Sequence, residues 1–209
     1  MKICVFGADG KTGVEVVNYA QQQSYEVLAF VYNNKTNPVF STDVEVNTGD
    51  IMNYDAVFNA VSGTDAVISV VGHISGSDPL MQTKGIANVV KAMESQGVKR
   101  IISLTGTGAR QIGDTPSFID RFINFFVKLV DPERIHDGVE HIKVLEQSNL
   151  DWTVVRVLKL GQSTAEPASY ELNNAGPAEL QTSRKKVAKI LVDQINSKEY
   201  IKMLPVVIG

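Results

Sequence analysis

The sequence predicts an α/β fold in which a doubly wound parallel sheet carries helices on both of its faces. Short segments that are apolar at nearly every position alternate along the chain with segments whose apolar residues recur at helical spacing. Strands that are apolar on both sides are typical of a parallel sheet covered by helices on both faces. The right-handed crossovers of such a sheet place its ligand crevice at the carboxyl ends of the strands.

Strands and helices alternate through the first half of the chain. We expect apolar strands over residues 3–6, 26–32, 44–47 and 66–71. Apolar residues at helical spacing predict helices over residues 14–20, 56–61 and 86–93. Gly97 follows the third helix, in the position where a glycine commonly ends a helix.

The second half continues the alternation with two interruptions. Strands are expected over residues 99–104 and 152–158, and helices over 135–145 and 187–195. Residues near 111–135 and 158–180 depart from the pattern, and we interpret them as excursions over the strand ends. Four phenylalanines in the first excursion lie at helical spacing, and we interpret them as core: Phe118, Phe122, Phe125 and Phe126. The alternatives are one wall of an apolar pocket or a self-association face.

The composition indicates one soluble globular domain. Hydrophobic residues make up 44% of the 209 residues and charged residues 21%, and the net charge of −3 argues against nucleic acid or a membrane as partner. The single cysteine, Cys4, excludes an intrachain disulfide and indicates a reducing compartment. No apolar run approaches the roughly 18 residues of a spanning helix. We therefore expect a cytoplasmic protein, and a monomer and a homodimer both remain open.

A glycine turn follows the first strand. Gly7, Gly10 and Gly13 form a G-x-x-G-x-x-G pattern between that strand and the first helix. In such a turn the first glycine allows the chain to leave the strand, the second admits a phosphate, and the third lets the helix pack closely. A Walker A loop would need a glycine where the chain has Val5. The turn therefore favours a dinucleotide over ATP or GTP hydrolysis.

The end of the second strand bears on which dinucleotide is bound. An acid there would hold the ribose hydroxyls of NAD, but no Asp or Glu occurs between Glu26 and Asp43. Asn33 and Lys35 lie in this stretch and could contact a 2′-phosphate. The stretch therefore favours NADP (NADPH) over NAD.

Five segments in chain order carry a resemblance to a known family: residues 7–13, 49–50, 65–72, 97–105 and 150–156. With them the chain resembles the atypical short-chain dehydrogenase/reductase (SDR) family of NAD(P)H-binding proteins. That family includes NmrA-like proteins and the biliverdin/flavin reductase type. The resemblance implies a single Rossmann-type NAD(P)-binding domain over residues 1–209, with substrate-side excursions near 111–135 and 158–180.

The resemblance also implies cofactor contacts at the glycine turn and the strand ends. These residues are Gly7, Asp9, Gly10, Lys11, Thr12 and Gly13 at the pyrophosphate, Tyr32 at the 2′-phosphate, Asp50 and Ile51 at the adenine, and Val71 and Gly72 beside the nicotinamide-side ribose. Thr105 stands where relatives carry a serine at the end of the fifth strand, and Lys159 near where the flavin reductase type has a histidine. His73 follows the fourth strand, where it would face the nicotinamide or the substrate.

The larger SDR enzymes use a Tyr-x-x-x-Lys pair, and none of the six tyrosines here is followed by lysine four residues later. Carbonyl reduction by that pair is therefore unsupported, whereas a conjugated acceptor can take its proton from water. We expect an NAD(P)H-dependent oxidoreductase of a small conjugated acceptor, of the flavin or quinone type, with Thr105 and Lys159 as candidate catalytic residues. The alternative is an NmrA-like redox sensor that binds NAD(P) and acts through a protein partner.

Two polar clusters are interpreted as surface. His136, Asp137, Glu140 and His141 could suggest a metal, but the two histidines are five residues apart, which does not place them on one helix face. We interpret this cluster as a polar helix surface and predict no metal site. Arg184, Lys185 and Lys186 are interpreted as a solvated first turn of the last helix.

Overall fold

The computed structural model describes residues 1–32, 40–72, 76–163, 165, 167 and 169–209. Their main feature is one twisted sheet with the order β3-β2-β1-β4-β5-β6-β10-β8. Its strands are β1 (Lys2–Phe6), β2 (Glu26–Val31), β3 (Glu45–Thr48), β4 (Ala66–Ser69), β5 (Arg100–Gly106), β6 (Asp151–Val157), β8 (Glu171–Asn173) and β10 (Val206–Ile208). Neighbouring strands are parallel except for β10 and β8 at the edge. The predicted doubly wound α/β fold is confirmed.

The central strand β1 explains why the strands are continuously apolar. Ile3 and Val5 belong to the core on one face of the sheet, and Cys4 and Phe6 to the core on the other face. All four side chains are fully buried. Cys4 is therefore a core residue, and burial raises the pKa of its thiol far above the ordinary value.

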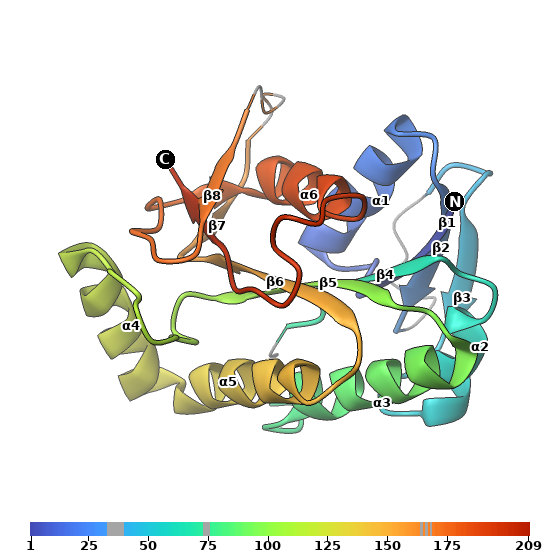
Figure 1. Cartoon of the computed structure of the whole chain (residues 1–209), viewed down its shortest axis with the longest axis horizontal. Helices are drawn as coiled ribbons and strands as arrows, with labels where there is room; N and C mark the ends of the chain where they lie inside the picture. The colour runs from blue at the N-terminus through green and yellow to red at the C-terminus, as the bar shows by residue number, and fades with distance from the viewer. Residues whose placement is uncertain (33–39, 73–75, 164, 166, 168) are drawn as a thin grey trace.

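Helices cover both faces of the sheet (Figure 1). On one face α1 (Lys11–Gln22) packs against α6 (Arg184–Asp193), and on the other α3 (Met81–Gln96) packs against α2 (Tyr54–Val61) and α5 (Pro132–Glu146). Gly97 ends α3 with φ +74°, and the next amide, of Val98, donates to the carbonyl of Met93. The predicted glycine stop is thus confirmed.

The helix α4 (Phe118–Val130) corrects the interpretation of the phenylalanine cluster. Phe118, Phe122, Phe125 and Phe126 are exposed, so their assignment to the core is wrong. The reason is that α4 turns its polar residues inward, where Asp120 is buried and hydrogen-bonded. Helical spacing reveals that one side of a helix is apolar, but not which side faces the protein.

The second excursion supplies short strands that carry no recognisable sequence pattern. Thr182–Ser183 (β9) pairs with Leu160–Gly161 (β7), and β8 joins the sheet by pairing antiparallel with β10. Such segments are too short for apolar alternation to be recognised. Within the described residues, no helix is long and apolar enough to cross a membrane.

Candidate functional site

The glycine turn has a geometry that depends on two of its glycines. Gly7 adopts φ +78°, a conformation that side chains disfavour. A Cβ on Gly13 would overlap the carbonyl of Gly7 and lie 2.7 Å from the Cα of Ala8. A Cβ on Gly10 would meet only the carbonyl oxygen of Gly7, at 3.2 Å. Gly13 is therefore required for packing of α1, while a side chain at residue 10 would meet a single backbone atom of the turn.

At the amino end of α1, no described side chain caps the backbone N–H groups. Gly10 is the N-cap and supplies no side-chain acceptor, and the first turn contains no acid. Unpaired N–H groups and the helix dipole favour an anion at such an end. The carboxylate of Asp9 does not cap the helix but accepts a hydrogen bond from the amide of Tyr32 at 3.1 Å. Asp9 thus ties the turn to the end of β2.

A cavity of about 560 Å³ lies beyond the carboxyl ends of β4, β5 and β6. Its lining comes from the strand ends, from one side of α4, and from the starts of other helices. Apolar residues dominate the lining: Val70, Val71, Leu104, Ala109, Ile123, Val127, Ile135, Val157, Leu158 and Leu160. This is the place where a doubly wound sheet binds its ligands.

The cavity brings together five of the residues singled out in the sequence: Thr12, Val71, Gly72, Thr105 and Lys159. The remaining described candidates are not in the cavity lining and lie at the glycine turn and after the ends of β2 and β3: Gly7, Asp9, Gly10, Lys11, Gly13, Tyr32, Asp50 and Ile51. Asp50 accepts a hydrogen bond from the amide of Met52, and Ile51 is buried against Gly85 of α3. Asn33, Lys35 and His73 lie outside the described residues.

The hydroxyl of Thr105 faces α5. A Cβ added to Gly138 would lie 2.8 Å from the Thr105 Oγ1 atom, so the helix approaches this strand end closely only because residue 138 is glycine. Both residues line the cavity. The Thr105 hydroxyl therefore lies at the junction of β5, α5 and the cavity.

A directed chain of hydrogen bonds lies behind the cavity wall. Gln82 Nε2 lies 3.3 Å from the carbonyl oxygen of Leu104, which can only accept, so this atom is the amide nitrogen. It also lies 3.3 Å from His141 Nδ1, and His141 Nε2 is 2.9 Å from Ser103 Oγ. His141 must then accept at Nδ1 and donate from Nε2, while Ser103 donates to the carbonyl of Ser69. Complete burial lowers the pKa of His141 to about 4, which keeps the ring neutral.

Asp137 joins α5 to the start of α3. Its carboxylate accepts hydrogen bonds from the amide of Gln82 at 3.0 Å and from the amide and hydroxyl of Thr83 at 2.8 and 2.6 Å. Asp137 and His141 are both completely buried, so their interpretation as a polar helix surface is wrong. Their side chains make structural hydrogen bonds. Of the four residues in this cluster, only His136 is exposed.

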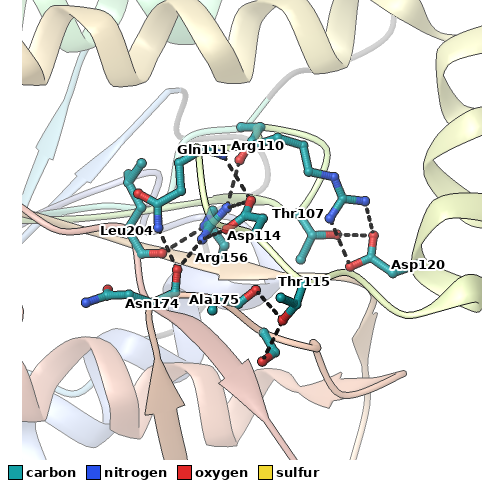
Figure 2. A network of polar contacts seen from close by, with 12 residues as sticks. Thr107, Arg110, Gln111, Asp114, Thr115, Asp120, Arg156, Asn174, Ala175 and Leu204 are labelled. Atoms are coloured by element: carbon teal, nitrogen blue, oxygen red, sulfur yellow. Dashed lines mark hydrogen bonds and ion pairs between the residues drawn. The ribbon is translucent and has the colours of Figure 1, made fainter.

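The loop between β5 and α4 is fixed by a buried ion pair (Figure 2). Arg156 of β6 donates to both carboxylate oxygens of Asp114, at 2.5 and 2.8 Å, and to the carbonyls of Ala109, Leu204 and Asn174. Burial has the largest single effect on Asp114 and opposes its charge, but the hydrogen bonds from Arg156 and from the amide of Gln111, with the charges of Arg156 and Arg110, together lower the pKa of the carboxyl. The loop that forms one side of the cavity is thus tied to β6 and to the C-terminal segment.

A second polar cluster fixes the orientation of α4 (Figure 2). The buried carboxylate of Asp120 accepts hydrogen bonds from Arg110 at 2.6 Å and from Thr107 at 3.2 Å. Asn124, one turn later, donates to the same carboxylate at 2.6 Å and to Thr107 at 3.0 Å. These contacts hold Asn124 in the cavity lining and turn the opposite side of α4 outward.

The charged groups in the described cavity lining are all cationic: Lys159, Arg134 and Arg184. Arg184 is half-buried and donates to the carbonyl of Gly161 at 3.1 Å, and Lys186 pairs with Glu179 at 2.8 Å. The interpretation of this helix start as a solvated turn is therefore wrong for these two residues. A cavity with apolar walls and cations suits a flat apolar molecule that carries or gains negative charge.

Several of these residues were not singled out as site residues in the sequence. Gly138 carried a signal, since a glycine inside an amphipathic helix indicates a close packing contact. Gln82, Asn124, Arg134 and Arg184 carried none, because polar residues on helices are ordinarily solvated. Only the packing of α3, α4, α5 and α6 around the strand ends brings them to the cavity.

Comparison with known proteins places this geometry among characterised folds. A family model described as NAD(P)H-binding matches residues 7–198. The chain is 26% identical over 162 residues to the uncharacterized protein YwnB of Bacillus subtilis, covering 73% of this chain and 70% of that protein.

Several solved structures match over the whole chain, and they include the following two. One is a short-chain dehydrogenase/reductase from Veillonella parvula in complex with NADP, with TM-score 0.82, 18% identity and 94% of that chain covered. The other is ChuY, an anaerobillin reductase from Escherichia coli O157:H7, with TM-score 0.82, 19% identity and 97% of that chain covered. At these identities the likeness concerns the fold.

Proposed function

The chain belongs to the NAD(P)H-binding family, and from this premise we propose that it is a reductase of a small conjugated acceptor of the flavin or quinone type. The observation that carries the proposal is the cavity at the ends of β4 to β6, with apolar walls, the Thr105 hydroxyl and a set of cations. Reductases among proteins of the same fold agree with this choice.

The chain's own groups have distinct tasks in this proposal. NAD(P)H, when bound, supplies a hydride to the acceptor. The apolar walls exclude water and hold the acceptor flat, which converts an encounter into an oriented contact. Thr105 positions the reacting rings through its hydroxyl, and Lys159 stabilises the negative charge that the acceptor gains. The accompanying proton comes from water.

The lining also supports reduction without a side-chain acid. The described lining includes no tyrosine and no carboxylate. His141, the nearest imidazole in the described network, is neutral, fully buried and committed at both nitrogens. A flavin or quinone does not require a tyrosine or a carboxylic acid as proton donor, so the described lining suits such an acceptor.

The test is steady-state oxidation of NADPH and NADH against a panel of flavins, quinones and azo dyes. We expect turnover with at least one conjugated acceptor. Thr105→Val should lower kcat about tenfold or more with little change in cofactor affinity, because the hydroxyl acts on the reacting ring. Lys159→Ala should act mainly on the KM of the acceptor. Tight cofactor binding without any turnover would favour the second candidate, an NmrA-like redox sensor, which the lack of a tyrosine or carboxylate among the described lining residues also suits.

We propose further that NADPH binds about tenfold more tightly than NADH, a difference of about 1.4 kcal/mol. The support is the acid-free stretch between Glu26 and Asp43, which includes Lys35. Asp9 is the nearby carboxylate that would oppose a 2′-phosphate, since it reaches the amide of Tyr32. Asp9→Asn should therefore raise the affinity for NADPH more than that for NADH.

Isothermal titration of both nucleotides measures this preference, with Gly10→Val as the control for the site. The added side chain should block the approach of the pyrophosphate and abolish binding of both nucleotides alike. Equal or tighter binding of NADH would reject the preference, while unchanged binding in Gly10→Val would reject the glycine turn as the site.

A further inference from the structure

The outer side of α4 is apolar and exposed. Seven large side chains, each between 49% and 83% exposed, form what we call the α4 face: Phe118, Ile119, Phe122, Phe125, Phe126, Leu129 and Val130. Water-exposed helix surfaces ordinarily carry polar residues. A face of this kind therefore requires an explanation beyond the fold of one chain.

The outward orientation of the α4 face is fixed by the other side of the helix. Asp120 is buried and accepts hydrogen bonds from Arg110, Thr107 and Asn124. Rotating α4 to bury the phenylalanines would break these contacts and leave a buried carboxylate without partners, at a cost of several kcal/mol. The exposure is thus built into the structure.

The exposed rings form one continuous surface. Ring centroids are 6.4 Å apart for Phe118 and Phe122, 4.7 Å for Phe122 and Phe126, and 5.7 Å for Phe125 and Phe126. Phe118, Phe122, Phe125 and Leu129 follow one another at intervals of four, three and four residues. This alternation is the spacing at which two helices pack side by side along a seam.

The size of the α4 face matches a protein interface. At about 200 Å² for a fully exposed phenylalanine, the four rings alone expose on the order of 500 Å². This area already lies in the upper part of the range found for the largest apolar patch on a typical monomer, about 300–600 Å². Ile119, Leu129 and Val130 extend it toward the roughly 800 Å² per partner of a standard interface.

We propose that the α4 face pairs with the same face of a second copy of this chain, forming a two-fold symmetric dimer. The seam spacing and the area favour a helix partner, and the net charge of −3 opposes attachment to an anionic bilayer. A two-fold contact needs one self-complementary patch, which α4 supplies alone. The pairing does not depend on the reaction proposed above.

Pairing has a direct consequence for the cavity. Ile123, Asn124 and Val127 lie on the inner side of the same helix and line the cavity. Within the described residues α4 packs mainly against α5. A second copy would support α4 from outside and hold this wall in place.

Sedimentation velocity over a hundredfold range of protein concentration tests the proposal. We expect the unaltered chain to be dimeric and the double variant Phe122→Glu with Phe125→Glu to be monomeric. Phe58→Glu is the matched control, because Phe58 is a partly exposed phenylalanine on α2, at the opposite end of the molecule (Figure 1), and this variant should remain dimeric. Circular dichroism and thermal unfolding show that each variant is folded.

Three results would overturn the proposal. One is a wild-type chain that stays monomeric over the whole range, and another is a double variant that remains dimeric. The third is a monomeric wild-type chain that sediments with vesicles of phosphatidylcholine and phosphatidylglycerol in equal parts, which would assign the α4 face to a membrane surface.

Discussion

Gly10 and Gly13 lie three residues apart in the same turn, yet their surroundings differ. A methyl group on Gly13 would overlap backbone atoms of Gly7 and Ala8, which cannot move without displacing β1 or α1. We predict that Gly13→Ala lowers the free energy of unfolding by about 3 kcal/mol or more. Gly10→Val should change it by less than about 1 kcal/mol, because its Cβ would meet only one backbone atom, the carbonyl oxygen of Gly7 at 3.2 Å.

Urea denaturation of the two variants measures this contrast. Equal stabilities would show that the turn relaxes around a Cβ at residue 13, and the close approach of α1 to β1 would then not depend on glycine.

At the scale of single residues, the sequence allowed us to predict the positions of site residues at the ends of the strands. Thr105, Val71 and Gly72 follow recognisable apolar strands, so their positions at the strand ends could be predicted. Gln82 and Arg184 lie on helices, and their approach to the cavity depends on how those helices pack. Local sequence does not encode that packing in a pattern of spacing.

At the scale of elements, Asp137 joins two helices. It belongs to α5, and its carboxylate lies at the amino end of α3. It accepts two amide and one hydroxyl hydrogen bond from Gln82 and Thr83. We predict that Asp137→Ala lowers the free energy of unfolding by about 2–4 kcal/mol, because buried donors lose a charged acceptor. Asp55→Ala, at the exposed first turn of α2, should have a fraction of this effect.

Chemical denaturation gives the stability of both variants, and hydrogen exchange at the amides of Gln82 and Thr83 reports the cap directly. Exchange that stays slow in Asp137→Ala would mean that another group replaces the carboxylate.

The elements that were predicted correctly are those with long periodic segments. α1, α3 and α5 showed apolar residues at helical spacing, and β1, β4 and β6 were apolar at most of their positions. The sequence did not predict β7, β8 and β10, because a strand of two or three residues is too short to show a hydrophobic period. The sequence showed that one side of α4 is apolar, but the side that faces the protein is determined by the hydrogen bonds of Asp120. The NAD(P)H-binding family that the resemblance implied is confirmed by the family match, which extends over residues 7–198.

At the scale of the whole molecule, His141 links stability to pH. Burial lowers its pKa in the folded chain to about 4, below the unfolded value of 6.5, so the unfolded chain binds the proton more readily. Its contribution is therefore complete above pH 6.5 and is lost as the pH falls toward 4. We predict that His141 alone lowers the free energy of unfolding by about 2 kcal/mol between pH 7 and pH 5.

Urea denaturation at several pH values tests this prediction. His141→Gln should flatten the dependence between pH 7 and pH 5, and His136→Gln, an exposed site on the same helix, should leave it unchanged. A wild-type curve that is already flat in this range would contradict the buried neutral imidazole.

The pairing of α1 with α6 has a consequence for synthesis of the chain. These helices come from opposite ends of the sequence, and Lys189 donates a hydrogen bond to the hydroxyl of Tyr19 across 170 positions. During translation the strand face that α6 covers stays uncovered until Arg184–Asp193 have left the ribosome, with synthesis at about 5–20 residues per second. Until then the nascent chain exposes apolar residues of the core that Val187 later joins, Val5 and Val155 among them, to water and to chaperones.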